Sequence, residues 1–101
     1  MIQEPGVDEI VLPTYAVLAR FRQDAPDGDE AVRLVAARLS AAGEPFQDVL
    51  VERQEGPRTW MVVARFVVVS IDGHTAVGGV VETLALSGLD PDEAWVDGQV
   101  V

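Results

Sequence analysis

The sequence predicts an α+β fold whose elements run strand, helix, strand, strand, helix, strand. Four segments have the alternating or continuous apolar character of strands, and two others carry apolar residues at helical spacing. Clusters rich in Gly, Pro and Asp separate these segments. A chain of 101 residues, 49% of them hydrophobic, can bury one core but not two, so we expect a single domain.

The first strand is expected at residues 15–22. Its odd positions, which include Tyr15 and Phe21, face one side of a sheet. Its even positions, which include Leu18 and Arg20, face the other side. The preceding residues 1–14 are expected to be an N-terminal extension to a domain at 15–101. Within the extension, Val7–Leu12 could form an extra edge strand or an arm, but Pro13 lacks a backbone donor and separates it from the strand.

The first helix is expected between the turn cluster Asp24–Gly28 and Gly43. Asp29 can cap it, with Glu30 in the first turn, where the helix dipole favours acids. Gly43 stands where a left-handed residue often ends a helix. The apolar residues between them recur at i, i+3, i+4 and i+7; they are Val32, Val35, Ala36 and Leu39.

Two extended segments, Phe46–Gln54 and Thr59–Ile71, flank the turn signal Glu55–Arg58 and predict a β-hairpin. A four-residue turn would place Gln54 opposite Thr59. On the face turned to the helices the pairs would then be Gln47–Phe66, Val49–Ala64, Val51–Val62 and Arg53–Trp60. On the opposite face they would be Phe46–Val67, Asp48–Arg65, Leu50–Val63 and Glu52–Met61.

The second helix is expected after the Asp72–Gly73 turn and before Gly88. Two glycines inside it, Gly78 and Gly79, leave its start open between Gly73 and Val80. They could also admit a close backbone or ligand, and the turn could instead lead into another strand. The residues at helical spacing are Val77, Val80, Val81 and Leu84.

The last strand is expected at Ala94–Val100, although Asp90–Glu93 also has the features of a helix N-terminus. This order of elements is that of the ferredoxin-like βαββαβ sandwich, an antiparallel four-stranded sheet with two helices on one face. We expect the spatial strand order 4-1-3-2. The name describes a fold and implies no iron.

The sheet face without helices should meet water in a monomer, yet it is largely apolar. Such a patch normally marks an interface or a ligand site, so we expect a homodimer that stacks these faces or pairs strand edges. The apolar residues of this face are Leu18, Phe46, Leu50, Met61, Val63, Val67 and Val69. The charged residues that would line the seam are Arg20, Arg22, Asp48, Glu52 and Arg65.

Arg65 lies in the middle of a valine-rich strand, where a charge is costly unless it is paired. It could hold a small anionic or amphipathic ligand together with Arg20, or form a structural pair with Asp48. The candidate ligand-binding or interface residues are Arg20, Asp48, Leu50, Met61, Val63 and Arg65.

The charge and composition exclude several partners. The formal net charge is −10 and all seven basic residues are arginine, so a nucleic acid partner is not expected. No apolar run approaches the roughly 20 residues that span a bilayer, and the acidic charge disfavours anionic membrane surfaces. The N-terminus lacks the pattern of a secretory signal, which predicts a cytoplasmic protein.

The sequence offers no catalytic, metal or cofactor motif. The absence of cysteine excludes disulfides, thiolate metal sites and cysteine nucleophiles. The acidic cluster Asp24–Glu30 lacks the spacing of a calcium loop, and no glycine-rich nucleotide motif is present. The single histidine, His74, could act as an acid or base but has no evident nucleophile or second metal ligand. We therefore expect no catalytic residue, no metal and no cofactor.

Two families share features with this chain. Ala19–Arg22, then a helix, then Val49–Arg53 and a long strand resemble the dimeric α/β-barrel group, which includes small cofactor-independent monooxygenases. That group's histidine-bearing second helix has no counterpart here. The loop Asp24–Gly28, followed by a helix and Ala41–Gly43, is similar to ACT-type regulatory modules, which bind amino acids at dimer interfaces. The loop lacks the Pro-Gly step of those modules.

We expect a non-catalytic homodimeric module with a small-ligand-binding or protein-interaction role. The alternative is a small cofactor-independent dimeric enzyme of the monooxygenase-like type, with a pocket between helices and sheet that uses Tyr15, Arg65 or His74. An acidic subunit of a larger complex is a third possibility.

Overall fold

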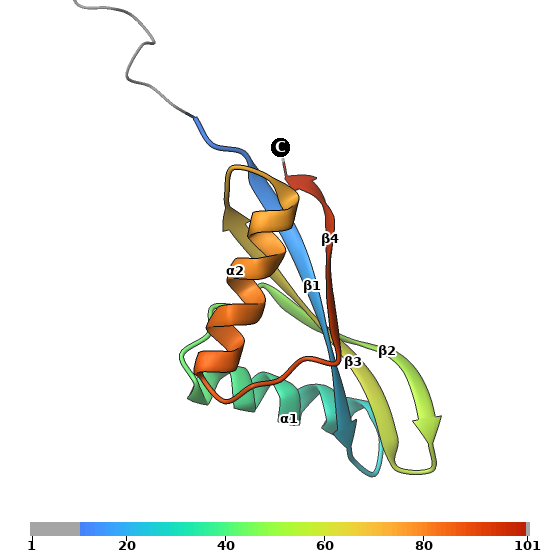
Figure 1. The fold of residues 1–101 in the computed structure, drawn as a ribbon. Coiled ribbons are helices and arrows are strands. Elements are labelled where there is room, and N and C mark those ends of the chain that lie inside the picture. The colour runs from blue at the N-terminus through green and yellow to red at the C-terminus, as the bar shows by residue number, and fades with distance from the viewer. Residues whose placement is uncertain (1–10, 101) are drawn as a thin grey trace, which may run out of the picture.

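A computed structural model describes residues 11–100 and confirms the ferredoxin-like α+β fold. The sheet is antiparallel, in the order β2-β3-β1-β4, which is the expected order read from its other edge (Figure 1). Val11 and Leu12 belong to no strand, and the rest of the proposed arm, 7–10, lies outside the described residues. The elements are β1 (Thr14–Asp24), α1 (Gly28–Ala41), β2 (Asp48–Gly56), β3 (Thr59–Val69), α2 (Gly73–Leu86) and β4 (Glu93–Val100).

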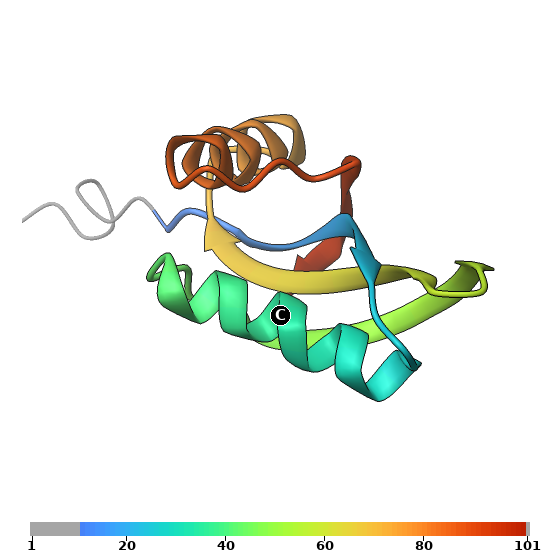
Figure 2. The same ribbon diagram turned by 90° about the horizontal axis from the view of Figure 1, so that it is seen from below.

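The two central strands carry the core. β1 and β3 pair along their whole length, from Thr14 opposite Val69 to Asp24 opposite Thr59. Their helix-facing side chains join the buried residues of both helices in one cluster, so both helices cover the same face of the sheet. The tip of the β2–β3 hairpin projects beyond the first turn of α1 (Figures 1 and 2). The largest fully buried residues are Val17, Val35, Leu39, Met61, Val62 and Leu84.

Helix α1 begins one residue after Asp27, which caps it, and not after Asp29 as the sequence suggested. Asp27 has extended backbone angles, and its carboxylate accepts a hydrogen bond of 2.8 Å from the Glu30 N–H. The first turn then rests so closely on the sheet that a Cβ on Gly28 would lie 3.2 Å from Val51 Cγ2. Asp29 is left as an acid in the first turn.

Helix α2 begins at Gly73, which resolves the choice left open by the sequence in favour of the earlier start. Asp72 caps it by accepting a hydrogen bond of 2.7 Å from the Thr75 N–H. Gly78 and Gly79 are inside the helix, and a Cβ on either would meet nothing within 4 Å. They therefore mark neither a late start nor a close approach of another backbone.

The hairpin register is partly as expected and partly wrong. The pairs from Asp48–Arg65 to Val51–Val62 are confirmed, but a bulge follows Val51. Because Glu52 is the extra residue, Met61 lies opposite Arg53 and Trp60 opposite Gln54. A second irregularity follows Gln54, and Gly56, not Gln54, lies opposite Thr59.

Strand β2 begins at Asp48, two residues later than the sequence suggested. The expected pairs of Phe46 and Gln47 with β3 therefore do not form, and the Gln47 N–H donates to the Arg65 carbonyl instead. Phe46 packs against the core cluster and is not part of the opposite sheet face.

The residues before β4 form a loop and not the helix start that Asp90–Glu93 resembles. The Asp92 N–H donates to the Arg20 carbonyl at 2.7 Å, which aligns the chain with β1 directly before Glu93. None of the helices among residues 11–100 is long and apolar enough to cross a membrane.

Candidate functional site

The sheet face opposite the helices, called the open face below, has a charged half and an apolar half. The charged half centres on Arg20 of β1, whose Nε and Nη2 donate to the two carboxylate oxygens of Glu52 at 2.7 and 2.8 Å. Its Nη1 donates to Glu93 of β4, and its guanidinium lies 4.8 Å from the centre of the Trp95 ring. We call Arg20, Glu52, Glu93 and Trp95 the Arg20 cluster.

The Arg20 cluster closes its half of the open face. Glu52 lies on β2 and Arg20 on β1, so their hydrogen bonds cross over β3, which runs between these strands. Met61 of β3 is only 1% exposed, although it lies on the open face. The hydrogen bonds from Arg20 lower the pKa of the Glu52 carboxyl and keep it ionised. Since all three Arg20 nitrogens donate to carboxylates, the cluster is a structural brace and not a free anion site.

The apolar half lies on β2 and β3, where Leu50, Val67 and Val69 are 60%, 39% and 64% exposed. Val63, the cross-strand partner of Leu50, lies between them and the cluster. Two charged residues, Asp48 and Arg65, stand among these side chains. We call the six residues the β2–β3 patch. Its apolar members Leu50, Val67 and Val69 are exposed to water.

Asp48 and Arg65 are cross-strand partners, as expected, but they do not form the expected ion pair. The Asp48 carboxylate accepts the N–H of Val49 at 2.9 Å, and Arg65 donates to the side-chain oxygen of Gln47. No ion pair within residues 11–100 involves either side chain. Arg65 and Arg20 also do not share a carboxylate, since Arg20 is engaged by Glu52 and Glu93.

The outer end of the open face carries a second group of charges. Arg53, beside the bulge, contacts Glu52 at 3.0 Å and Glu55 at 3.2 Å, and Arg22 lies 3.9 Å from Glu55. The two arginine side chains are about half exposed. They surround the hairpin tip and leave the β2–β3 patch free.

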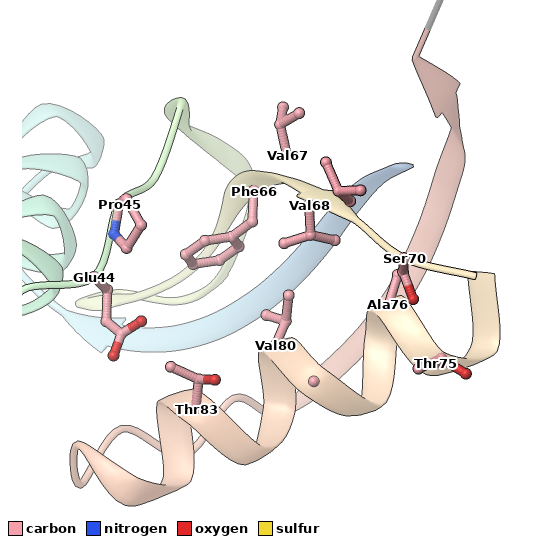
Figure 3. Close-up of a pocket in the computed structure, with 12 residues that line it drawn as sticks. Glu44, Pro45, Phe66, Val67, Val68, Ser70, Thr75, Ala76, Val80 and Thr83 are labelled. Carbon is pink, nitrogen blue, oxygen red and sulfur yellow. The ribbon is translucent and has the colours of Figure 1, made fainter. Parts of the chain in front are cut away.

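A groove of about 430 Å³ lies between the end of β3 and α2, and its lining reaches Val67 and Val69 of the β2–β3 patch at the edge of the sheet (Figure 3). The β3 residues beyond Arg65 pair with β1 but have no partner on the other side, because β2 begins opposite Arg65, and the groove lies at this uncovered edge. In Figure 3, Val68 and Val80 point toward each other, the Phe66 ring points toward Pro45, and Glu44 lies at one end of the groove. The Glu44 carboxylate accepts a hydrogen bond of 2.7 Å from Ser87.

His74 is exposed in the first turn of α2 and does not line the groove. Among the described residues no group of three His, Asp or Glu side chains could hold a metal ion. Sequence reasoning placed Arg20, Asp48, Leu50, Val63 and Arg65 on one face, as the structure does, but it missed Glu93, Trp95 and the groove. The alternation along β4, which puts Glu93 and Trp95 on the side of Arg20, could have found the first two.

Comparison with protein-family models, with curated proteins and with solved structures gives no match for this chain. The chain is therefore defined by its own fold and surface, as a ferredoxin-like α+β domain with a partly closed open face.

Proposed function

We propose that this chain is a non-catalytic homodimeric module and that two copies associate through the β2–β3 patch. The observation that carries the proposal is the exposure of Leu50, Val67 and Val69 on one sheet face, with Leu50 on one side of the Asp48–Arg65 pair and the two valines on the other. Sheet faces of this composition are normally covered, and contiguous apolar patches on soluble domains mark interaction sites.

The charge distribution supports a second copy as the occupant. The protein has a net charge of −10, so two copies repel each other over most of their surfaces. Over the open face and the hairpin tip, four arginines lie near four carboxylates, which offsets the negative charge locally and makes this a surface on which two copies can approach. These residues are Arg20, Arg22, Arg53 and Arg65 with Asp48, Glu52, Glu55 and Glu93.

The proposal is tested by the mass of the protein in solution. Light scattering at tens of micromolar should give twice the chain mass of 10.8 kDa. Leu50→Asp should give a folded monomer, because Leu50 is already 60% exposed and the fold does not depend on it. The matched control is Leu86→Asp on α2, where the leucine is 84% exposed but lies outside the patch; it should leave the dimer intact. A monomeric parent protein, or equal behaviour of the two variants, would refute the proposal.

The groove between β3 and α2 favours a second role, the binding of a small apolar or amphipathic ligand. Its volume is in the usual range of ligand sites, and most of its lining is apolar, with the hydroxyls of Ser70, Thr75 and Thr83 as polar groups. Glu44 is the titratable residue of the lining, and Ser87 already donates to it. This composition supports binding better than it supports the enzymatic alternative, which needs convergent acid and base groups.

Two adjacent glycines provide the test of the groove. Gly79 lines it and Gly78 does not, and a Cβ on either would meet nothing within 4 Å. With anilinonaphthalene sulfonate as a fluorescent probe, Gly79→Leu should lower the binding signal by filling the groove. Gly78→Leu should leave the signal as in the parent protein. Equal signals from both variants would show that the probe binds elsewhere.

A further inference from the structure

We propose that, in the homodimer, Arg65 of each chain forms an ion pair with Asp48 of the partner subunit. The two ion pairs are related by a twofold axis that runs parallel to the strands, between β2 and β3. This inference rests on the proposed dimer. It specifies how the two sheets are aligned in the dimer and identifies Arg65 and Asp48 as the residues that determine this alignment.

The starting observation is that Asp48 and Arg65 are the two unpaired charges in the middle of the open face. The other arginines of the open face, Arg20, Arg22 and Arg53, each contact a carboxylate. Asp48 and Arg65 lie directly opposite each other, yet one accepts a backbone N–H and the other binds a neutral amide. Each has capacity for a further hydrogen-bonded partner, since a carboxylate accepts several hydrogen bonds and a guanidinium has five N–H donors.

Asp48 and Arg65 would both be buried when two copies associate through the β2–β3 patch. Leu50 and Val63 are the next pair along the same two strands, and Val67 follows Arg65 on the same face. When these apolar side chains are covered, both charges leave water with them. An unpaired charge in a dry seam is strongly destabilising, whereas a hydrogen-bonded pair is tolerated. In the proposed pairing the partner subunit supplies an opposite charge to each, in addition to the cross-strand neighbour of the same chain.

The register of the hairpin allows one simple symmetric solution. A twofold axis parallel to the strands, between β2 and β3 and in the plane of contact, exchanges the two strands. It brings Arg65 over Asp48 of the partner subunit and Leu50 over Val63 of the partner subunit, because the two members of each pair are at the same height. Stacked sheets lie about 10 Å apart, a gap that a long arginine and a short aspartate can bridge together.

Charge reversal tests this pairing. Asp48→Arg places two positive charges on each chain at the seam, and Arg65→Asp places two negative charges there. Each variant alone should lose dimer affinity by at least about tenfold, because like charges then face each other across the axis. An equimolar mixture of the two should recover dimers of one chain of each kind, since every position then meets its opposite.

The controls are reversals of the same charge outside the open face. Arg33→Asp and Glu82→Arg on the helices change the net charge as the seam variants do, and they should leave the dimer unchanged. Circular dichroism shows whether each variant is folded. A parent dimer whose affinity is unaffected by both seam variants, or no recovery in the mixture, would overturn the pairing and leave the proposed dimer standing. A monomeric parent protein would overturn both.

Discussion

Arg20 and Glu52 join β1 to β2 by two parallel hydrogen bonds of 2.7 and 2.8 Å that cross the strand between them. Glu93 and Trp95 hold the same guanidinium from β4, so one side chain links the two outer strands of the sheet. Bidentate pairs of arginine and carboxylate are the most directional ion pairs in proteins. The cluster therefore braces one half of the open face, whereas the apolar side chains of the other half are exposed.

Replacing Arg20 should lower the free energy of unfolding without changing the association of two chains. Arg20→Met keeps an apolar side chain over β3 but removes every donor to Glu52 and Glu93. The free energy of unfolding in urea should fall by about 1 kcal/mol, since partly exposed ion pairs contribute little more. Arg33→Met is the control, because Arg33 pairs only with Glu30 of its own helix and is 69% exposed. A loss of stability in the control as large as that at Arg20 would contradict a special role for the brace.

The same pair predicts how stability depends on pH. The hydrogen bonds from Arg20 lower the pKa of Glu52 below its ordinary value of 4.5, so the ionised form is favoured by folding. That stability is complete above pH 4.5 and is lost as the pH falls through the lower pKa of the folded protein. Urea midpoints measured from neutral pH to about pH 3 should fall less steeply for Glu52→Gln than for the parent. Glu82→Gln, on α2, should follow the parent curve.

The sequence predicted the order of the elements because each has a strong local signal. The alternation at residues 15–22 and the valine-rich run of β3 fixed the central strands, and the pairing of Asp48 with Arg65 followed from them. The bulge at Glu52 had no such signal, since any residue can occupy a bulge and its position depends on the whole sheet.

The features of the site that the sequence did not predict depend on the bulge in β2 and on the residue at which β2 begins. Regular alternation placed Glu52 on the same face as Arg20, but it did not indicate the bulge that brings Arg53 opposite Met61 beside them. The groove depends on β2 beginning two residues later than its apolar pattern suggests, at Asp48. Long-range side-chain contacts of this kind arise from packing and leave little trace in local sequence.

The cap of α1 gives a local test of the structure. Asp27, and not Asp29, accepts the hydrogen bond from the Glu30 N–H. Asp27→Ala should therefore lower the free energy of unfolding by about 1 kcal/mol, the usual cost of losing an N-cap. Asp29→Ala removes the same charge from the same turn and should have the smaller effect. The reverse order of the two variants would place the helix start at Asp29.

Replacement by alanine should change the stability of the protein in opposite directions at Gly88, which follows the C-terminus of α2, and at Gly78, which lies inside the helix. Gly88 has a φ of +79°, and the Leu89 N–H beyond it closes the helix by donating to the Leu84 carbonyl at 2.8 Å. Alanine is strained in that conformation, so Gly88→Ala should destabilise the protein by about 1 kcal/mol.

Gly78, by contrast, lies inside the helix, where an added Cβ meets nothing within 4 Å. Gly78→Ala should stabilise the protein by up to about 1 kcal/mol, because alanine loses less backbone entropy in a helix than glycine does. Thermal unfolding of the two variants against the parent separates the cases. If Gly78→Ala were destabilising, the helix could not run unbroken through the glycine pair, and a start of α2 near Val80 would again be the better description.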